Sequence, residues 1–162
     1  MRKLTRNLML AGMASMPAVL SSVPAMAAEA PASPHTFTSN VALVSNYVFR
    51  GLTQTFGKPA IQAGMDYAHA SGAYAGLWGS NISSDQYAGG TVEIDYYLGY
   101  NGKLAGDWGW TVGYYGYAYP GANYKNSQTP GADQTYNTEE VNAGVSWKWV
   151  SLKLSSTVSD YF

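Results

Sequence analysis

The sequence predicts an all-β protein, an antiparallel up-and-down transmembrane β-barrel, from three observations. Apolar and polar residues alternate with period two along most of the chain, which is typical of strands. Aromatic residues make up 14% of the 162 residues and charged residues only 12%, against about 25% in an average soluble domain. Mean hydropathy is −0.17, which is too low for a helical membrane protein. The lack of basic excess excludes a nucleic-acid-binding protein, and a chain without Cys has no disulfide or thiolate metal site.

The N-terminus has the organisation of a secretory signal peptide. A basic segment (2–6) precedes an apolar segment (8–23) and an A-x-A cleavage site (25–27). The apolar segment is shorter than the roughly 20 residues of a membrane-spanning helix, which disfavours the alternative of a membrane anchor. We expect export through the inner membrane to the cell outer membrane. The predicted division is a signal peptide (1–27), a leader (28–35) and a β-barrel domain (36–162).

Period-two alternation predicts seven strands after the leader. In chain order they cover residues 37–49, 61–68, 74–82, 91–100, 108–115, 140–147 and 152–158. Gly, Pro and Ser mark the connections, and the longest, 120–137, contains two Pro-Gly pairs. In segment 141–149 the apolar positions are odd-numbered, and from Leu152 they are even-numbered. Such a change requires a tight turn or a bulge near Lys148, and of the two we expect a turn.

Two architectures fit such strands, a soluble ligand-binding sandwich in the periplasm and a transmembrane barrel. The longest predicted strands are about 10 to 13 residues long, nearer to the 9 to 11 of a membrane-spanning strand than to the soluble average of five to six. Short and long connections alternate, like the periplasmic turns and extracellular loops of outer-membrane barrels. Aromatic residues near strand ends form a candidate interfacial girdle: Tyr47, Phe49, Trp108, Trp110, Tyr117, Tyr119, Trp147 and Trp149. The barrel is therefore preferred.

The positions between the apolar residues are polar and suit a hydrated lumen. The candidate lumen-facing residues are Arg50, Gln62, Asp66, Glu93, Asp95, Glu140, Asn142 and Lys148. Rings of carboxylates favour cations, and a facing arginine sets a local transverse field. The alternative role for Arg50 is a structural ion pair with Asp66 or Glu93, because small barrels are filled by their own side chains.

The strand count raises a question of completeness. Seven is an odd number below the usual minimum of eight, so Phe162 would lie on the extracellular side and two sheet edges would stay unpaired in lipid. We therefore expect a partial barrel from a truncated chain. The alternative is that Phe162 is a C-terminal aromatic assembly signal of a complete protein.

Catalytic and metal-binding patterns are weak. His35 and His69 lack metal-ligand spacing in the sequence, and His69 is expected to cap a turn. Glu93 and Asp95 share one strand face without a partner nucleophile, and no nucleotide-binding or hydrolase motif occurs. The tyrosines of segment 114–119 suit sugar stacking less well than interfacial anchoring or packing. We expect no enzymatic activity and no cofactor or metal.

Longer segments point to a family. They are SNYVFRGLTQTFGKPAIQAGMDYAHASGAYAGLWGSNI (45–82), EIDYYLGYNGK (93–103), YAYPGANY (117–124), NTEEVNAGVSW (137–147) and VSDYF (158–162). Together they resemble the TorF family of porins, also called the Gcw_chp family. Asn46 replaces the usual Asp and Leu52 a frequent Ile, and family members continue with further strands. The resemblance implies an outer-membrane barrel of no defined substrate and supports truncation.

The expected function is a porin that passes small hydrophilic solutes by passive diffusion. The alternative is a non-conducting structural or adhesive barrel that holds loops such as 120–137 outside the cell. The expected partners are outer-membrane lipid and the barrel-assembly machinery during insertion, with no nucleic acid and with a homo-oligomer left open. The solute is not defined by the sequence.

Overall fold

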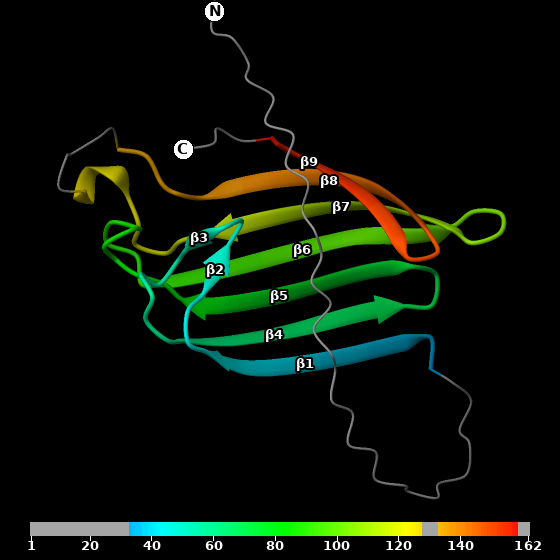
Figure 1. Ribbon diagram of the computed structural model, residues 1–162, viewed down its shortest axis with the longest axis horizontal. Helices are drawn as coiled ribbons and strands as arrows, with labels where there is room; N and C mark the ends of the chain where they lie inside the picture. Colours follow the sequence, from blue (N-terminus) through cyan, green and yellow to red (C-terminus); the bar gives the residue numbers. More distant parts are fainter. Residues whose placement is uncertain (1–32, 128–132, 159–162) are drawn as a thin grey trace, which may run out of the picture.

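The computed structural model describes residues 33–127 and 133–158, which form one large antiparallel sheet of seven strands and one small hairpin (Figure 1). The prediction of an all-β, antiparallel, seven-stranded fold is confirmed. The predicted signal peptide and most of the predicted leader lie outside the described residues. No helix within the described ranges is long and apolar enough to span a membrane.

Every strand of the large sheet pairs antiparallel with the strand that precedes it in the sheet order. In this order the strands are β1 (His35–Val44), β4 (Ala60–His69), β5 (Ala73–Asn81), β6 (Val92–Lys103), β7 (Trp108–Ala118), β8 (Thr138–Trp147) and β9 (Val150–Thr157). The hairpin consists of β2 (Val48–Phe49) and β3 (Leu52–Thr53), and a short 3₁₀ helix, η1, covers Tyr124–Asn126. The large sheet is therefore an up-and-down meander, and among the described residues further strands occur only in the β1–β4 connection.

The sheet has two chemically different faces, because successive side chains of a strand point to opposite sides. We call one the apolar face; its exposed members include Phe37, Leu43, Ile61, Met65, Leu77, Leu98, Val112, Val145 and Leu152. The opposite side, the polar face, carries Thr38, Gln62, Asp66, Glu93, Asp95, Tyr97, Tyr115, Glu140 and Asn142. Most members of the polar face are buried or half-buried, in contrast to the apolar face: Glu93 is 1% exposed, whereas Leu43 is 82% exposed.

The two ends of the sheet also differ. At the turn end, on the right in Figure 1, the connections are the short segments 70–72, 104–107 and 148–149. At the loop end, on the left, the connections are 45–59, 82–91 and 119–137. The buried hydrophobic cluster comes from the loop end and consists of Tyr47, Ala60, Ile82, Tyr87, Tyr119, Ala122 and Tyr136. The packed core therefore sits at one end of the sheet, outside its apolar face.

Glycine permits close packing at two kinds of position. Gly72 closes the β4–β5 turn with a φ of 107°, and a Cβ there would lie 2.0 Å from the Asn101 carbonyl oxygen. Gly76 lies beneath the ring of Tyr97, its partner on β6, where a Cβ would come within 2.4 Å of the ring. Tyrosine rings that lie flat over glycines of a neighbouring strand thus cover part of the polar face, without a second layer of protein.

The expected turn near Lys148 is present, while the first predicted strand is too long. Trp147 pairs with Val150, and Lys148 has a φ of 51° in the two-residue turn between them. Strand β1 ends at Val44, whereas the prediction extended it to residue 49. The Asn46 side chain accepts hydrogen bonds from Thr53 (2.6 Å) and Thr55 (3.0 Å), so the chain turns back there. Local side-chain bonding thus overrides a weak alternation.

The sheet is open. Among the described residues β1 pairs only with β4, and β9 pairs only with β8. A closed barrel is thus absent from the described part of the chain, and each outer edge presents unpaired backbone groups, as edge strands do.

Candidate functional site

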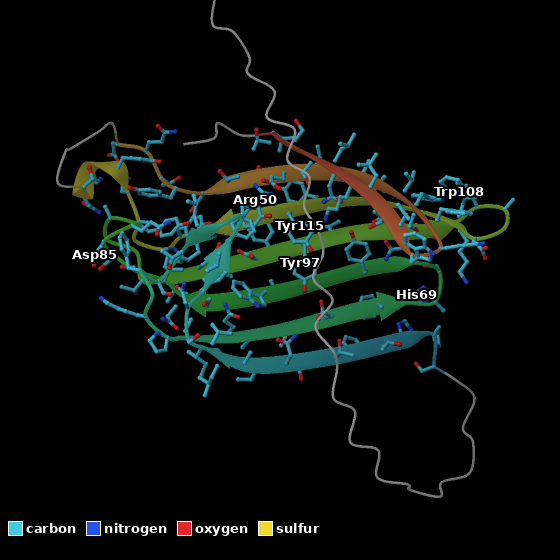
Figure 2. The ribbon with its side chains drawn as sticks, in the orientation of Figure 1. Arg50, His69, Asp85, Tyr97, Trp108 and Tyr115 are labelled. Carbon is cyan, nitrogen blue, oxygen red and sulfur yellow. The ribbon has the colours of Figure 1, made fainter. Side chains whose placement is uncertain are left out.

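The candidate site is the polar face together with the β1–β4 connection, residues 45–59, which folds over it. We call Val48–Thr53 the hairpin tip. Arg50 and Gly51 form its two-residue turn with φ values of 49° and 86°. Two positive φ values are typical of the type I′ turn that suits a tight hairpin. The hairpin lies in front of the sheet in Figure 1, and Figure 2 shows Arg50 at its tip.

Buried residues fix the base of this connection. Tyr47 is 9% exposed and meets Trp78 of β5 edge to face, with ring centroids 5.3 Å apart. Thr55 is 2% exposed, and its hydroxyl accepts a hydrogen bond from the Tyr47 amide at 3.2 Å. Gln54, also 2% exposed, accepts a hydrogen bond from the Tyr87 hydroxyl. The base belongs to the buried cluster of the loop end.

Two contacts join the tip to the wall of the sheet. The Phe49 ring packs against the Tyr117 ring of β7 with centroids 5.8 Å apart. The Arg50 guanidinium donates two hydrogen bonds, of 2.7 and 2.8 Å, to the two carboxylate oxygens of Glu140 on β8. The Glu140 side chain is only 5% exposed. The Arg50 side chain is 28% exposed, so only the carboxylate end of the pair is buried, and the pair connects the tip to β8.

A second acidic group lies under the base of the connection. Glu93 Oε1 accepts a hydrogen bond of 2.8 Å from the Tyr119 hydroxyl, and the Tyr47 hydroxyl faces the same carboxylate. Burial, followed by the charge of Glu93, raises the pKa of Tyr47 and Tyr119 above the usual tyrosine value, so both remain protonated donors. Glu93 Oε2 and Asp95 Oδ1 are buried without a hydrogen-bond partner among the described residues. The polar face therefore holds more acidic than basic groups near the loop end.

Tyrosines continue the site toward the middle of the sheet (Figure 2). The rings of Tyr97 and Tyr115 stack with centroids 4.8 Å apart, and the Tyr97 hydroxyl donates to Asp66. The Lys153 ammonium of β9 lies 5.2 Å from the Tyr115 ring centroid. These contacts form a polar, aromatic surface with few uncompensated charges, unlike the acidic region beside the hairpin.

Six of the eight residues predicted to face the lumen lie on the polar face. They are Gln62, Asp66, Glu93, Asp95, Glu140 and Asn142. Arg50 reaches this face from the hairpin tip, although the prediction placed it at the end of a strand. Lys148 lies in the β8–β9 turn, 3.9 Å from Asp107, and not on the polar face. Both differences arise because non-strand segments do not follow the alternation.

The partner of Arg50 was predicted incorrectly. The sequence suggested Asp66 or Glu93, and the structure pairs Arg50 with Glu140. No sequence signal could have identified that partner, because 90 residues separate the two positions.

The predicted aromatic girdle divides into two groups. Trp108, Trp110, Trp147 and Trp149 lie at the turn end, where the rings of Trp108 and Trp147 are 6.2 Å apart and Trp149 is 88% exposed. The other four residues do not lie on the exposed apolar face. Tyr47 and Tyr119 are buried in the loop-end cluster, and Phe49 packs on Tyr117. Tyr117 pairs with Asp95 in register and so belongs to the polar face.

The structure also brings the two histidines together. His35 and His69 are register partners of β1 and β4 with ring centroids 5.0 Å apart, although they are distant in sequence. The His69 ring bonds to Ser71 within the β4–β5 turn, as expected for a turn-capping residue. No group of three or more His, Cys, Asp or Glu able to hold a metal occurs in the described ranges.

Comparison with known proteins identifies a family. A family model described as a bacterial protein of unknown function, Gcw_chp, matches residues 28–162. No curated protein matches the chain, and no solved structure matches it. The expected family label is thus confirmed, and its description assigns no activity.

Proposed function

The chain belongs to the Gcw_chp family, and from this premise we propose that it forms the wall of an outer-membrane porin through which small hydrophilic solutes diffuse passively. In this proposal the apolar face contacts lipid and the polar face lines a hydrated lumen. The turn end faces the periplasm and the loop end faces the cell exterior, as in known outer-membrane barrels.

The observation that carries the proposal is the exposure of the apolar face. Phe37, Leu43 and Leu98 are 77%, 82% and 55% exposed, although they occupy the positions that a soluble sandwich would bury. Monomeric soluble proteins rarely expose a continuous apolar surface of this kind. Lipid contact would account for the exposure along all seven strands. A sandwich would require a second sheet packed on the apolar face, and the second sheet of the described residues, β2–β3, lies over the polar face instead.

The exposed tryptophans give the proposal an orientation. Trp108, Trp147 and Trp149 gather at the turn end, where a membrane–water interface would lie. The predicted signal peptide would bring the chain to the periplasm, and the barrel-assembly machinery would insert it. These steps, and the outer-membrane location, are parts of the proposal.

Closure of the barrel requires more strands than the sheet has. Seven alternating strands leave β1 and β9 running in the same direction, so pairing them directly would be parallel. Outer-membrane barrels are antiparallel, which means that an odd number of further strands must lie between β9 and β1. A second copy in the same membrane orientation would meet the same parallel mismatch. The proposal therefore favours completion by additional strands over closure by a homodimer.

The expected transport is diffusive with a preference for cations. Asp66 and Asp95 lie on the polar face, while Arg50 is already neutralised by Glu140. Carboxylates that line a pore favour cations over anions. The residues 45–59 narrow the space above the polar face, so the proposed pore is small.

A second candidate is a structural or adhesive barrel without conductance. The observation that favours it is the hairpin, whose residues cover part of the polar face and pack into the loop-end cluster. If further side chains fill the rest of the lumen, no solute passes.

Conductance in planar lipid bilayers decides between the two candidates. The full-length protein is purified in detergent, and its heat-modifiable migration on a gel is first used to select closed barrels. We expect reproducible current steps and a reversal potential in a KCl gradient that indicates preference for K⁺ over Cl⁻. A heat-modifiable protein that inserts and gives no current would support the non-conducting barrel. Partition into detergent-free buffer would overturn both in favour of a soluble protein.

A further inference from the structure

We infer that the Arg50–Glu140 ion pair is a latch that holds the hairpin tip over the polar face, and that its release widens the lumen and increases cation selectivity. The inference deepens the proposed porin function and rests on it for the consequences in transport. The latch itself is a property of the fold and is testable without any conductance.

The first argument is that base and tip are held by different forces. The base is anchored by Tyr47, Gln54 and Thr55, which are all at most 9% exposed. The tip has its own two-stranded pairing, which is not continuous with the large sheet. Val48 and Leu52 of the tip are 54% and 67% exposed, so neither is packed against the wall. The tip is thus a small unit that can swing while its base stays in place.

The second argument concerns the contacts that oppose such a movement. The tip meets the wall through the Phe49 ring, which packs on Tyr117 and against the buried cluster, and through the Arg50–Glu140 pair. The Arg50 guanidinium also lies 4.8 Å from the centroid of the Phe49 ring, so the two contacts act together. Arg50 adopts a φ of 49° as the first central residue of the hairpin's type I′ turn, so the turn itself presents the guanidinium at the end of the tip.

The third argument concerns charge. In the latched state the Arg50 guanidinium cancels the charge of Glu140. When the tip moves away, Glu140 stays on the polar face and loses its Arg50 partner. The wall then gains one uncompensated negative charge at the place where the obstruction has been removed. A single movement therefore changes both the width of the pore and its ionic preference.

Trypsin tests the latch directly, because Arg50–Gly51 is itself a trypsin site at the centre of the turn. The full-length protein in detergent is compared with Glu140→Gln, which keeps the side-chain shape and removes the charge. The matched control is Glu139→Gln, the same change at the neighbouring position, which points to the apolar face. We expect cleavage after Arg50 to be at least about 10-fold faster in Glu140→Gln and unchanged in the control, because proteolysis follows the population of the open form.

Cleavage at other sites separates release of the tip from general unfolding. Lys103, Lys125 and Lys153 lie outside the connection, and cleavage at these lysines should stay at the wild-type rate in Glu140→Gln. Equal rates after Arg50 in wild type and Glu140→Gln would overturn the latch. Faster cleavage at all sites together would also overturn it, because the pair would then support the whole sheet and not the tip.

Bilayer recordings test the consequence for transport. Glu140→Gln should give larger current steps than wild type, and Arg50→Ala, which leaves Glu140 ionised, should in addition shift the reversal potential toward greater cation selectivity. Unchanged steps in both variants would overturn the coupling of the latch to the pore. If no variant and no wild-type protein conducts, the porin function fails, while the trypsin result still decides on the latch.

Discussion

The loop end and the turn end of the sheet are stabilised by different means. At the loop end, Tyr87 stacks on Tyr119 at 4.4 Å and Tyr124 on Tyr136 at 4.1 Å, and long connections cover them. At the turn end, Trp108 is 48% exposed and Trp149 is 88% exposed. The loop end thus has a core like that of a soluble protein, whereas the turn end leaves its largest apolar side chains to whatever surrounds the protein.

This comparison explains how a single sheet stays ordered without a second layer. The apolar face contributes no buried core, so packing free energy must come from the loop-end cluster, from tyrosines lying on glycines and from the backbone ladder. The surroundings of the apolar face provide the rest. We expect substitutions at the loop end to lower the free energy of unfolding in any medium. The effect of substitutions on the apolar face should depend on whether lipid is present.

The largest expected effect is at the loop end. Tyr119→Ala removes a ring that is 5% exposed, its stacking on Tyr87 and its hydrogen bond to Glu93. Loss of a large buried side chain costs about 3–5 kcal/mol. Trp108→Ala, the control at the turn end, should cost less than about 1 kcal/mol because the ring is not enclosed. Urea unfolding in detergent measures both, and equal costs would remove the distinction between the two ends.

The next effect separates lipid from water at the apolar face. Val112→Arg places a charge in the middle of β7 on the apolar face, where Val112 is 45% exposed. In a lipid bilayer such a charge costs about 2–4 kcal/mol, and in water an exposed position tolerates it. The control is Thr111→Arg on the opposite, polar face of the same strand. Refolding yields into lipid vesicles should fall for Val112→Arg alone.

A soluble protein gives a different pattern in the same experiment. If Val112→Arg refolds as well as Thr111→Arg in vesicles, the apolar face does not contact lipid, and another protein surface must cover it. The two variants differ by one residue position, so they have the same net charge and nearly the same depth along the strand.

A smaller effect is expected where an aromatic ring covers a glycine. A Cβ at Gly76 would meet the Tyr97 ring at 2.4 Å, so Gly76→Ala should cost about 1–3 kcal/mol through overpacking. Gly106, in a turn with nothing within 4 Å of a Cβ and a φ of 67°, is the control. Gly106→Ala should lower the free energy of unfolding by only about 1 kcal/mol, the cost of placing a residue with a Cβ at a positive φ. Thermal unfolding followed by circular dichroism compares the two variants, and equal costs would mean that Tyr97 moves away freely.

The sequence predicted the features that depend on local pattern and missed those that depend on contacts between distant segments. Alternation predicted the seven strands of the large sheet, the polar face and the turn at Lys148, because each depends on side-chain period or on a local turn. The hairpin within residues 45–59 was missed, because Val48, Phe49 and Leu52 look like the continuation of β1. The Arg50–Glu140 pair depends on how the connection folds back, which no local pattern contains. Buried Tyr47 and Tyr119 were assigned to an interface for the same reason.

The smallest effect belongs to the exposed part of the loop end. The Lys125 ammonium donates to Asp133 at 3.1 Å, and hydrogen bonds from Lys125 and Asn123 hold the pKa of the Asp133 carboxyl below its usual value. Lys125→Ala should raise that pKa toward normal, and the change should shrink in high salt because both groups are exposed. NMR titration of the Asp133 carboxyl measures it. We expect no measurable change in unfolding, since exposed ion pairs contribute little to stability. A clear loss of stability in Lys125→Ala would mean that the long connection 119–137 supports the buried cluster through this pair as well as through its tyrosines.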